Sequence, residues 1–206
     1  MRVRRFVSFV AIGSAFATVE EFLTVVILRH DVPSYLFTLL VLFPTYLTVV
    51  YIFGRSLDRL VPDQAARDLV HLLATGGLGL LLEWTLMDLS PWSNPAANPL
   101  LMLGLQLGMF AFWATVATAP RAFLDHSGPS RDARRRIMRF YVPYFAMVYV
   151  VGLSVPQRWR FGIIIPSIVV GYSVVAGILF RWAVALHYRN VRISPSDRML
   201  EGTGEP

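Results

Sequence analysis

Two adjacent glutamates, Glu20 and Glu21, lie inside an apolar run that extends from Phe6 to Leu28. A charged residue at the centre of a membrane helix costs roughly 2.5–3.5 kcal/mol on insertion scales, so acidic residues at this depth usually have a function. Two neighbouring carboxylates in a low dielectric cannot both ionise cheaply. We therefore expect the pair to carry a proton or a cation, or to act as general acid and base.

A second acidic residue follows small residues in a later apolar run. Glu83 shares a helix face with Gly76 and Gly79, much as the first pair shares a face with Gly13. Small residues let membrane helices approach closely. The pattern predicts that the first and third apolar runs pack together with their acidic faces turned inward.

Four runs place a polar side chain at a similar depth, because helices rise 1.5 Å per residue. This predicts a polar layer near the outer leaflet, to which Ser167 also belongs. Its substrate- or proton-binding residues are expected to be Glu20, Glu21, Glu83 and Gln106. Its mouth is expected to hold His30, Asp31, Asp88, Arg158 and Arg160.

Histidine spacing does not indicate a metal site, because the chain contains no Glu-x-x-His and no histidine pair at i, i+4. All four histidines fall near the ends of apolar runs, and we interpret them as surface or interfacial residues. They are His30, His71, His126 and His187.

The elements that must position these residues are membrane helices. The chain has 206 residues, of which 55% are hydrophobic and only 16% charged, with a mean hydropathy of +0.55. These values predict an all-α polytopic membrane protein, a bundle of six transmembrane helices over residues 1–192 with a disordered tail at 193–206. The expected spans are Phe6–Leu28, Ser34–Phe53, Leu69–Leu86, Pro99–Ala119, Phe140–Val155 and Phe161–Leu186.

Prolines inside three of these runs predict kinks in the second, fifth and sixth helices, at Pro44, Pro143 and Pro166. Tyrosines at helical spacing in the last two runs are interpreted as core residues.

Arginine distribution predicts the orientation. With a cytoplasmic N-terminus, 16 of the 19 basic residues fall on the inside, so both termini are expected to be cytoplasmic in a multi-pass protein of a cell inner membrane. Arg2 to Arg5, followed by Ala15-Phe16-Ala17, also has the pattern of a signal peptide with a cleavage site, so retention or removal of the first helix stays open.

Composition excludes several classes of partner and cofactor. The absence of cysteine removes thiol chemistry, and without phosphate-binding motifs no cofactor is predicted. The basic residues flank apolar runs, which does not indicate nucleic-acid binding. We expect the lipid bilayer as a partner, with anionic headgroups at Arg131–Arg139; a homo-oligomer or a partner subunit is left open.

Three functions fit these residues. The leading hypothesis is a small integral membrane transporter or channel-like protein that binds a proton or a cationic solute at the intramembrane carboxylates. The second is a membrane-embedded enzyme that acts on a lipid or isoprenoid with the same carboxylates as acid and base. The third is a non-catalytic scaffold subunit, so enzymatic activity stays undecided.

Overall fold

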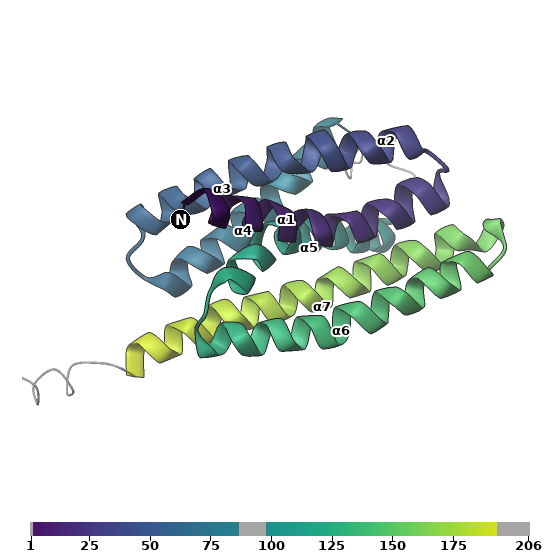
Figure 1. The fold of residues 1–206 in the computed structure, drawn as a ribbon. Helices are drawn as coiled ribbons and strands as arrows, with labels where there is room; N and C mark the ends of the chain where they lie inside the picture. Colours follow the sequence, from purple (N-terminus) through teal and green to yellow (C-terminus); the bar gives the residue numbers. More distant parts are fainter. Residues whose placement is uncertain (1, 87–97, 193–206) are drawn as a thin grey trace, which may run out of the picture.

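Helices form every regular element in the part of the chain that the computed structural model describes, residues 2–86 and 98–192 (Figure 1). Within these residues, six helical segments are long and apolar enough to cross a membrane, which confirms the expected all-α, multi-pass composition. They are Val3–Leu28, Val32–Leu60, Gln64–Thr85, Pro99–Leu124, Gly128–Ser154 and Gln157–Leu186. The predicted tail at 193–206 and Asp88 lie outside the described residues.

The first two spans combine α-helical with wider π-helical turns. α1 (Arg2–Glu21) runs directly into η1 (Phe22–Leu28), and the second span consists of α2 (Val32–Phe37), η2 (Thr38–Leu42) and α3 (Phe43–Leu60). Pro44, which has no N–H to donate, lies at the start of α3, directly after η2. The kink predicted at Pro44 therefore coincides with a change from π-helical to α-helical hydrogen bonding. The first span changes from α-helical to π-helical hydrogen bonding at Phe22, where there is no proline.

The remaining four spans are longer than their apolar runs. They are α4 (Gln64–Leu86), α5 (Pro99–Leu124), α6 (Gly128–Ser154) and α7 (Gln157–Arg192). α6 begins twelve residues before the predicted Phe140, because Ser127 caps its first turn through a hydrogen bond from Ser130 N. α6 and α7 continue as single helices through Pro143 and Pro166.

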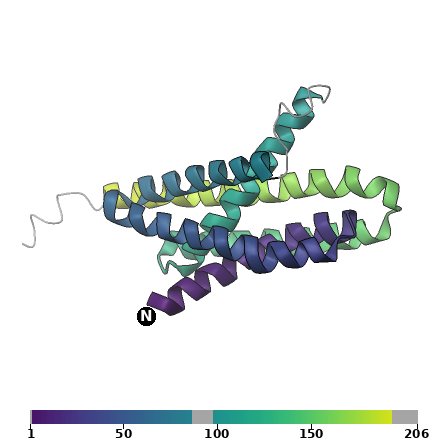
Figure 2. The same ribbon diagram turned by 90° about the horizontal axis from the view of Figure 1, so that it is seen from above.

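The bundle has two distinct ends. α1 begins and α7 ends at the same end, where the α3–α4 and α5–α6 connections also lie (Figures 1 and 2). We call it the basic end, since Arg5, Arg55, Arg67 and Arg121 line one hollow there. The opposite end, here called the far end, holds the connections between η1 and α2 and between α6 and α7.

α5 is the central helix of the bundle. It packs against α4, α7, α1 and α6, and residues 111–120 are buried without interruption. A Cβ atom at Gly79 would lie 2.0 Å from Trp113 Cγ, and one at Gly76 would lie 2.6 Å from Phe110 Cε2, so the glycines of α4 accommodate α5. The predicted packing of the first run against the third through these glycines is therefore wrong, because α5 fills that interface.

Candidate functional site

The glutamate pair lies at the junction between α1 and η1. Glu20 and Glu21 are the last two α-helical residues, and the π-helical turns start at Phe22. Thr24 Oγ1 donates to the Glu20 carbonyl at 3.1 Å. π-helical turns are rare and often occur at functional sites. The β-branched residues at 24–27 are the local signal that the α-helix is weakened there.

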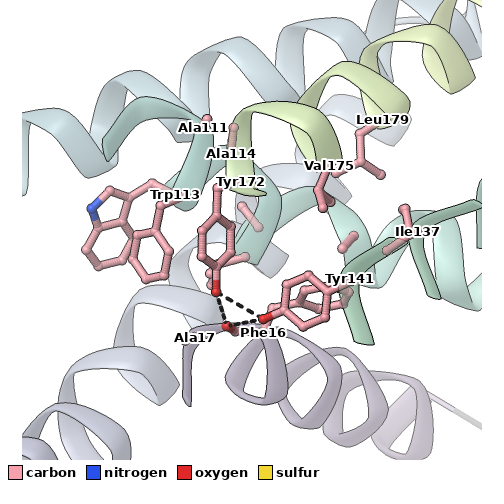
Figure 3. Packing of buried hydrophobic residues seen from close by; sticks show 14 of the residues in the cluster. Phe16, Ala17, Ala111, Trp113, Ala114, Ile137, Tyr141, Tyr172, Val175 and Leu179 are labelled. Atoms are coloured by element: carbon pink, nitrogen blue, oxygen red, sulfur yellow. Dashed lines mark hydrogen bonds between the residues drawn. The ribbon is translucent and has the colours of Figure 1, made fainter. Parts of the chain in front are cut away.

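Tyrosines of α6 and α7 fix α1 just before this junction. Tyr141 and Tyr172 both donate to the Phe16 carbonyl, at 3.0 and 2.6 Å (Figure 3). Tyr149 donates to the Val19 carbonyl at 3.2 Å, directly before the glutamate pair. Their hydroxyl groups donate to main-chain carbonyls, so these tyrosines position α1; Tyr172, which the sequence predicts to lie in the core, is fully buried.

Glu83 of α4 faces α5. Trp113 Nε1 donates to Glu83 Oε1 at 3.0 Å. The indole of Trp113 fits against α4 because Gly79, one turn before the glutamate, has no side chain. It also packs edge-on against Tyr46, with ring centroids 4.5 Å apart. Sequence reasoning found Glu83 but not the tryptophan that orients it.

The three carboxylates lie close enough to act on one another electrostatically. Glu20 is repelled by Glu21 and Glu83, and Glu83 also repels Glu21. Arg29, an exposed residue at the end of η1, attracts all three. Each carboxylate residue is half-buried. The structure thus brings together three of the four residues that the sequence predicts for the layer.

The fourth predicted residue, Gln106, binds the neighbour of Glu83. Its Oε1 accepts a hydrogen bond of 2.6 Å from Trp84 Nε1. Gln106 is buried in α5, two turns before Trp113. Ser167, at the same predicted depth on α7, donates to the Ile163 carbonyl of its own helix. The polar layer therefore involves α1, α4 and α5, while Ser167 turns to its own helix.

The far end of the bundle joins η1 to α7. Gln157 Nε2 donates to His30 Nε2 at 3.0 Å, and Arg160 Nη1 donates to Gln157 Oε1 at 3.0 Å. His30 has a φ of 58°, the left-handed conformation that turns the chain from η1 to α2. Two of the predicted mouth residues, His30 and Arg160, are thus connected through a glutamine.

Two other predicted mouth residues have local partners. Asp31 caps α2, since its carboxylate accepts from Ser34 N at 3.0 Å and from Ser34 Oγ at 2.5 Å. These hydrogen bonds lower the pKa of Asp31. The Arg158 guanidinium lies 5.8 Å from the ring centroid of Trp159.

A second polar cluster, at the basic end, was missed. Arg121 of α5 donates through Nη2 to Asp58 Oδ1 at 2.9 Å and through Nε to Asp68 Oδ1 at 2.8 Å. His71, one turn beyond Asp68, is fully buried, and its Nδ1 lies 3.2 Å from Thr118 Oγ1. The surface interpretation of His71 is wrong, because its face of α4 packs against α5. The i, i+3, i+7 spacing of Asp68, His71 and Thr75 is the signal that could have revealed this polar stripe.

No group of three His, Cys, Asp or Glu side chains arranged to hold a metal ion is found among the described residues. Comparisons with protein families, with curated proteins and with solved structures found no match to this chain.

Proposed function

We propose that this protein is a small multi-pass membrane transporter in which Glu20, Glu21 and Glu83 bind a proton or a cationic solute. The observation that carries the proposal is the grouping of three mutually repelling carboxylates, from two membrane-spanning helices, with one exposed arginine, Arg29, as the attracting charge. Three negative charges and one positive charge are unfavourable in a low dielectric. Uptake of protons or of a cation removes the imbalance.

Partial exposure supports binding over a purely structural role. Glu20, Glu21 and Glu83 are all half-buried, whereas a layer that served only to specify helix packing could be sealed. Trp113, which donates to the Glu83 carboxylate, is a neutral group, and the Thr24 hydroxyl donates to the main-chain carbonyl of Glu20. Neutral donors orient carboxylates and leave their net charge unchanged.

Orientation and location belong to the same proposal. The arginine distribution supports cytoplasmic termini, so the basic end faces the cytoplasm of a bacterial inner membrane or its equivalent, and the carboxylates take up their ligand from the outer side. Arg131–Arg139 then lies at the level of anionic headgroups.

The experiment is flux measured in liposomes that contain the purified full-length protein. A pH-sensitive dye inside the vesicles reports proton entry driven by an imposed pH gradient, with and without an added cation. We expect Glu20→Gln and Glu21→Gln to abolish this flux and Glu83→Gln to reduce it, while the circular dichroism spectrum stays that of the wild type.

Asp31→Asn is the matched control, because it removes a carboxylate at the same end of the bundle whose hydrogen bonds go to Ser34 in the cap of α2. It should leave flux unchanged. Wild-type flux in both Glu20→Gln and Glu21→Gln, or no flux in the wild type, would overturn the proposal and favour the scaffold hypothesis.

A further inference from the structure

A hollow of about 280 Å³ opens at the basic end between α1, α3, α4 and α5. Four arginines and three aspartates line it, together with His71. They are Arg5, Arg55, Arg67, Arg121, Asp58, Asp68 and Asp125. At about 30 Å³ per water molecule, the volume is larger than a few ordered waters need. It has room for a small polyatomic ion or the charged head of a larger molecule.

All three carboxylates of the hollow already have donors. Asp58 and Asp68 bind Arg121 at 2.9 and 2.8 Å. Asp125 accepts from Ser127 Oγ at 2.6 Å and from Ser130 Oγ. The negative charge of the hollow is therefore directed at groups of the protein itself.

The positive charge is only partly used. Among the described residues, Arg5 and Arg55 form no hydrogen bond and no ion pair, and both line the hollow. Arg67 binds the Asp58 carbonyl through Nη1 at 3.2 Å, but its buried Nε has no partner there. Two whole guanidinium groups and one further N–H are thus left for a ligand.

His71 supplies a buried polar atom beside these arginines. The residue has no exposed surface, and its Nε2 forms no well-aligned hydrogen bond to any described residue; the Val50 carbonyl near the ring is only a weak acceptor. When the Thr118 hydroxyl donates to Nδ1, Nε2 carries the ring proton and can donate. A buried donor with only a weak acceptor is costly, so this atom favours an occupied hollow.

Gly54 of α3 keeps the inner wall open. A Cβ atom at this position would lie 2.6 Å from Arg121 Nη1 and 3.2 Å from His71 Nε2. The absence of a side chain lets the guanidinium and the imidazole come together at the base of the hollow. Polar side chains from α4 and α5 therefore meet at the base of the hollow, as in a binding site.

We propose that this hollow binds a phosphate group, held by Arg5 and Arg55 at the entrance, with Arg67 Nε and His71 Nε2 as the unpaired donors of its inner wall. Two unpaired guanidinium groups match the roughly two negative charges of a phosphate monoester better than the single charge of a carboxylate. The group belongs either to a free phosphorylated solute or to a lipid headgroup. An adjoining hollow shares Tyr51 and Arg55 and is lined by the apolar Val3, Phe6 and Ile52, which suits acyl chains.

The first experiment uses inorganic phosphate as the probe. Full-length protein in phosphatidylcholine nanodiscs is titrated with phosphate at constant ionic strength, and the midpoint of thermal unfolding and the heat of binding are recorded. For a free ligand we expect saturable binding that Arg55→Gln and His71→Gln weaken about tenfold or more, since each removes a donor to a charged group.

The second experiment tests the lipid source. Nanodiscs that contain phosphatidic acid in phosphatidylcholine replace the pure phosphatidylcholine discs, and native mass spectrometry counts the phosphatidic acid retained by the protein. If the ligand is a headgroup, the wild type retains it, Arg55→Gln loses it, and inorganic phosphate gives no saturable signal.

Arg4→Gln is the matched control for Arg5→Gln, and Arg59→Gln is the control for Arg55→Gln. Each control removes the same charge from the same helix, but neither Arg4 nor Arg59 lines this hollow. Arg59 lines the adjoining apolar hollow, so Arg59→Gln is a control for the titration with inorganic phosphate and not for lipid retention. Both controls should bind phosphate like the wild type. If His71→Gln fails to fold, the comparison rests on Arg5 and Arg55, which are partly or fully exposed.

Two outcomes would overturn the proposal. One is the absence of saturable binding in both experiments. The other is equal weakening of inorganic phosphate binding by Arg55→Gln and Arg59→Gln, which would indicate general attraction by a basic surface.

Discussion

Two carboxylates at the basic end of the bundle are paired with an arginine, whereas those at the α1–η1 junction repel one another. At the basic end, Asp58 and Asp68 each contact the guanidinium of Arg121 within 2.9 Å. At the α1–η1 junction, Glu20 and Glu83 lie near other carboxylates, and the attracting charge is an exposed Arg29. The two aspartates are thus paired with a cation, whereas Glu20, Glu21 and Glu83 form no ion pair with any described residue.

We interpret this difference as one between charge that holds helices together and charge that is available for the proposed function. A buried pair holds helices together because removing either partner leaves the other uncompensated. Carboxylates that repel one another contribute little to folding and can be neutralised without loss. The predictions below test this distinction, beginning with the largest expected effect.

Loss of Arg121 should have the largest effect on stability. Arg121→Gln leaves Asp68, whose side chain is 3% exposed, without its cation, and we expect the free energy of unfolding to fall by about 3–5 kcal/mol. Reversible unfolding in mixed micelles measures this. Arg67→Gln is the control, because its bridge to Asp58 spans 3.9 Å and should be worth less than about 1 kcal/mol. Equal losses in the two variants would contradict the structural role of Arg121.

A methyl group at Gly79 should disturb the packing around Glu83. The added Cβ would collide with Trp113, the donor to Glu83, so we expect Gly79→Ala to cost about 1–3 kcal/mol and to reduce flux in liposomes. Gly77→Ala is the matched control, since no atom lies within 4 Å of its Cβ position. It should stabilise α4 by about 0.5–1 kcal/mol. The prediction fails if both variants behave alike.

Neutralising the glutamates should cost nothing in stability. Glu20→Gln removes repulsion from Glu21 and Glu83, and we expect the free energy of unfolding to stay constant or rise by about 1 kcal/mol. Asp68→Asn makes the same chemical change where the carboxylate is paired, so it should destabilise the protein. Unfolding curves of the two variants, recorded side by side, give opposite signs if the comparison holds. A large loss of unfolding free energy in Glu20→Gln would indicate that the glutamates hold helices together.

The smallest effect concerns Asp125, in the connection between α5 and α6. Partial burial alone would raise the pKa of Asp125, but hydrogen bonds from Ser127 and Ser130 outweigh it and hold the pKa below the usual 3.8. A lowered pKa in the folded state contributes stability above pH 3.8 that is lost as the pH falls through the folded value.

The Asp125→Asn variant should therefore lose less stability than the wild type between pH 5 and pH 3, a window that brackets roughly the ordinary aspartate pKa. Asp132→Asn, which removes an exposed carboxylate on α6, is the control for a general charge effect. A wild-type acid response in Asp125→Asn would contradict the hydrogen-bond explanation.

Hydropathy predicted the spans because lipid imposes length and apolarity on every crossing helix. Hydropathy did not predict the helix boundaries, because arginines end an apolar run but can continue a helix. α6 shows this: it includes the whole stretch from Arg131 to Arg139, with Ala133 and Ile137 buried on one face.

The candidate site was predicted only in part. Glu20, Glu21 and Glu83 are visible as charges in apolar runs. Trp113 is not, because it reaches Glu83 through tertiary packing. The central position of α5 decides these contacts, and no local pattern encodes which helix a glycine face will meet.

The π-helical stretch beyond Glu21 has a consequence for chain length. A π-helical turn holds more residues than an α-helical turn. A one-residue deletion within Phe22–Leu28 can be absorbed by a change to α-helical hydrogen bonding, which keeps both the glutamate pair and the His30 turn in register. The same deletion in α5 would rotate every later side chain by about 100°. In an alignment with homologues of this chain, we therefore expect single-residue gaps between Glu21 and Arg29, and none between Gln106 and Arg121.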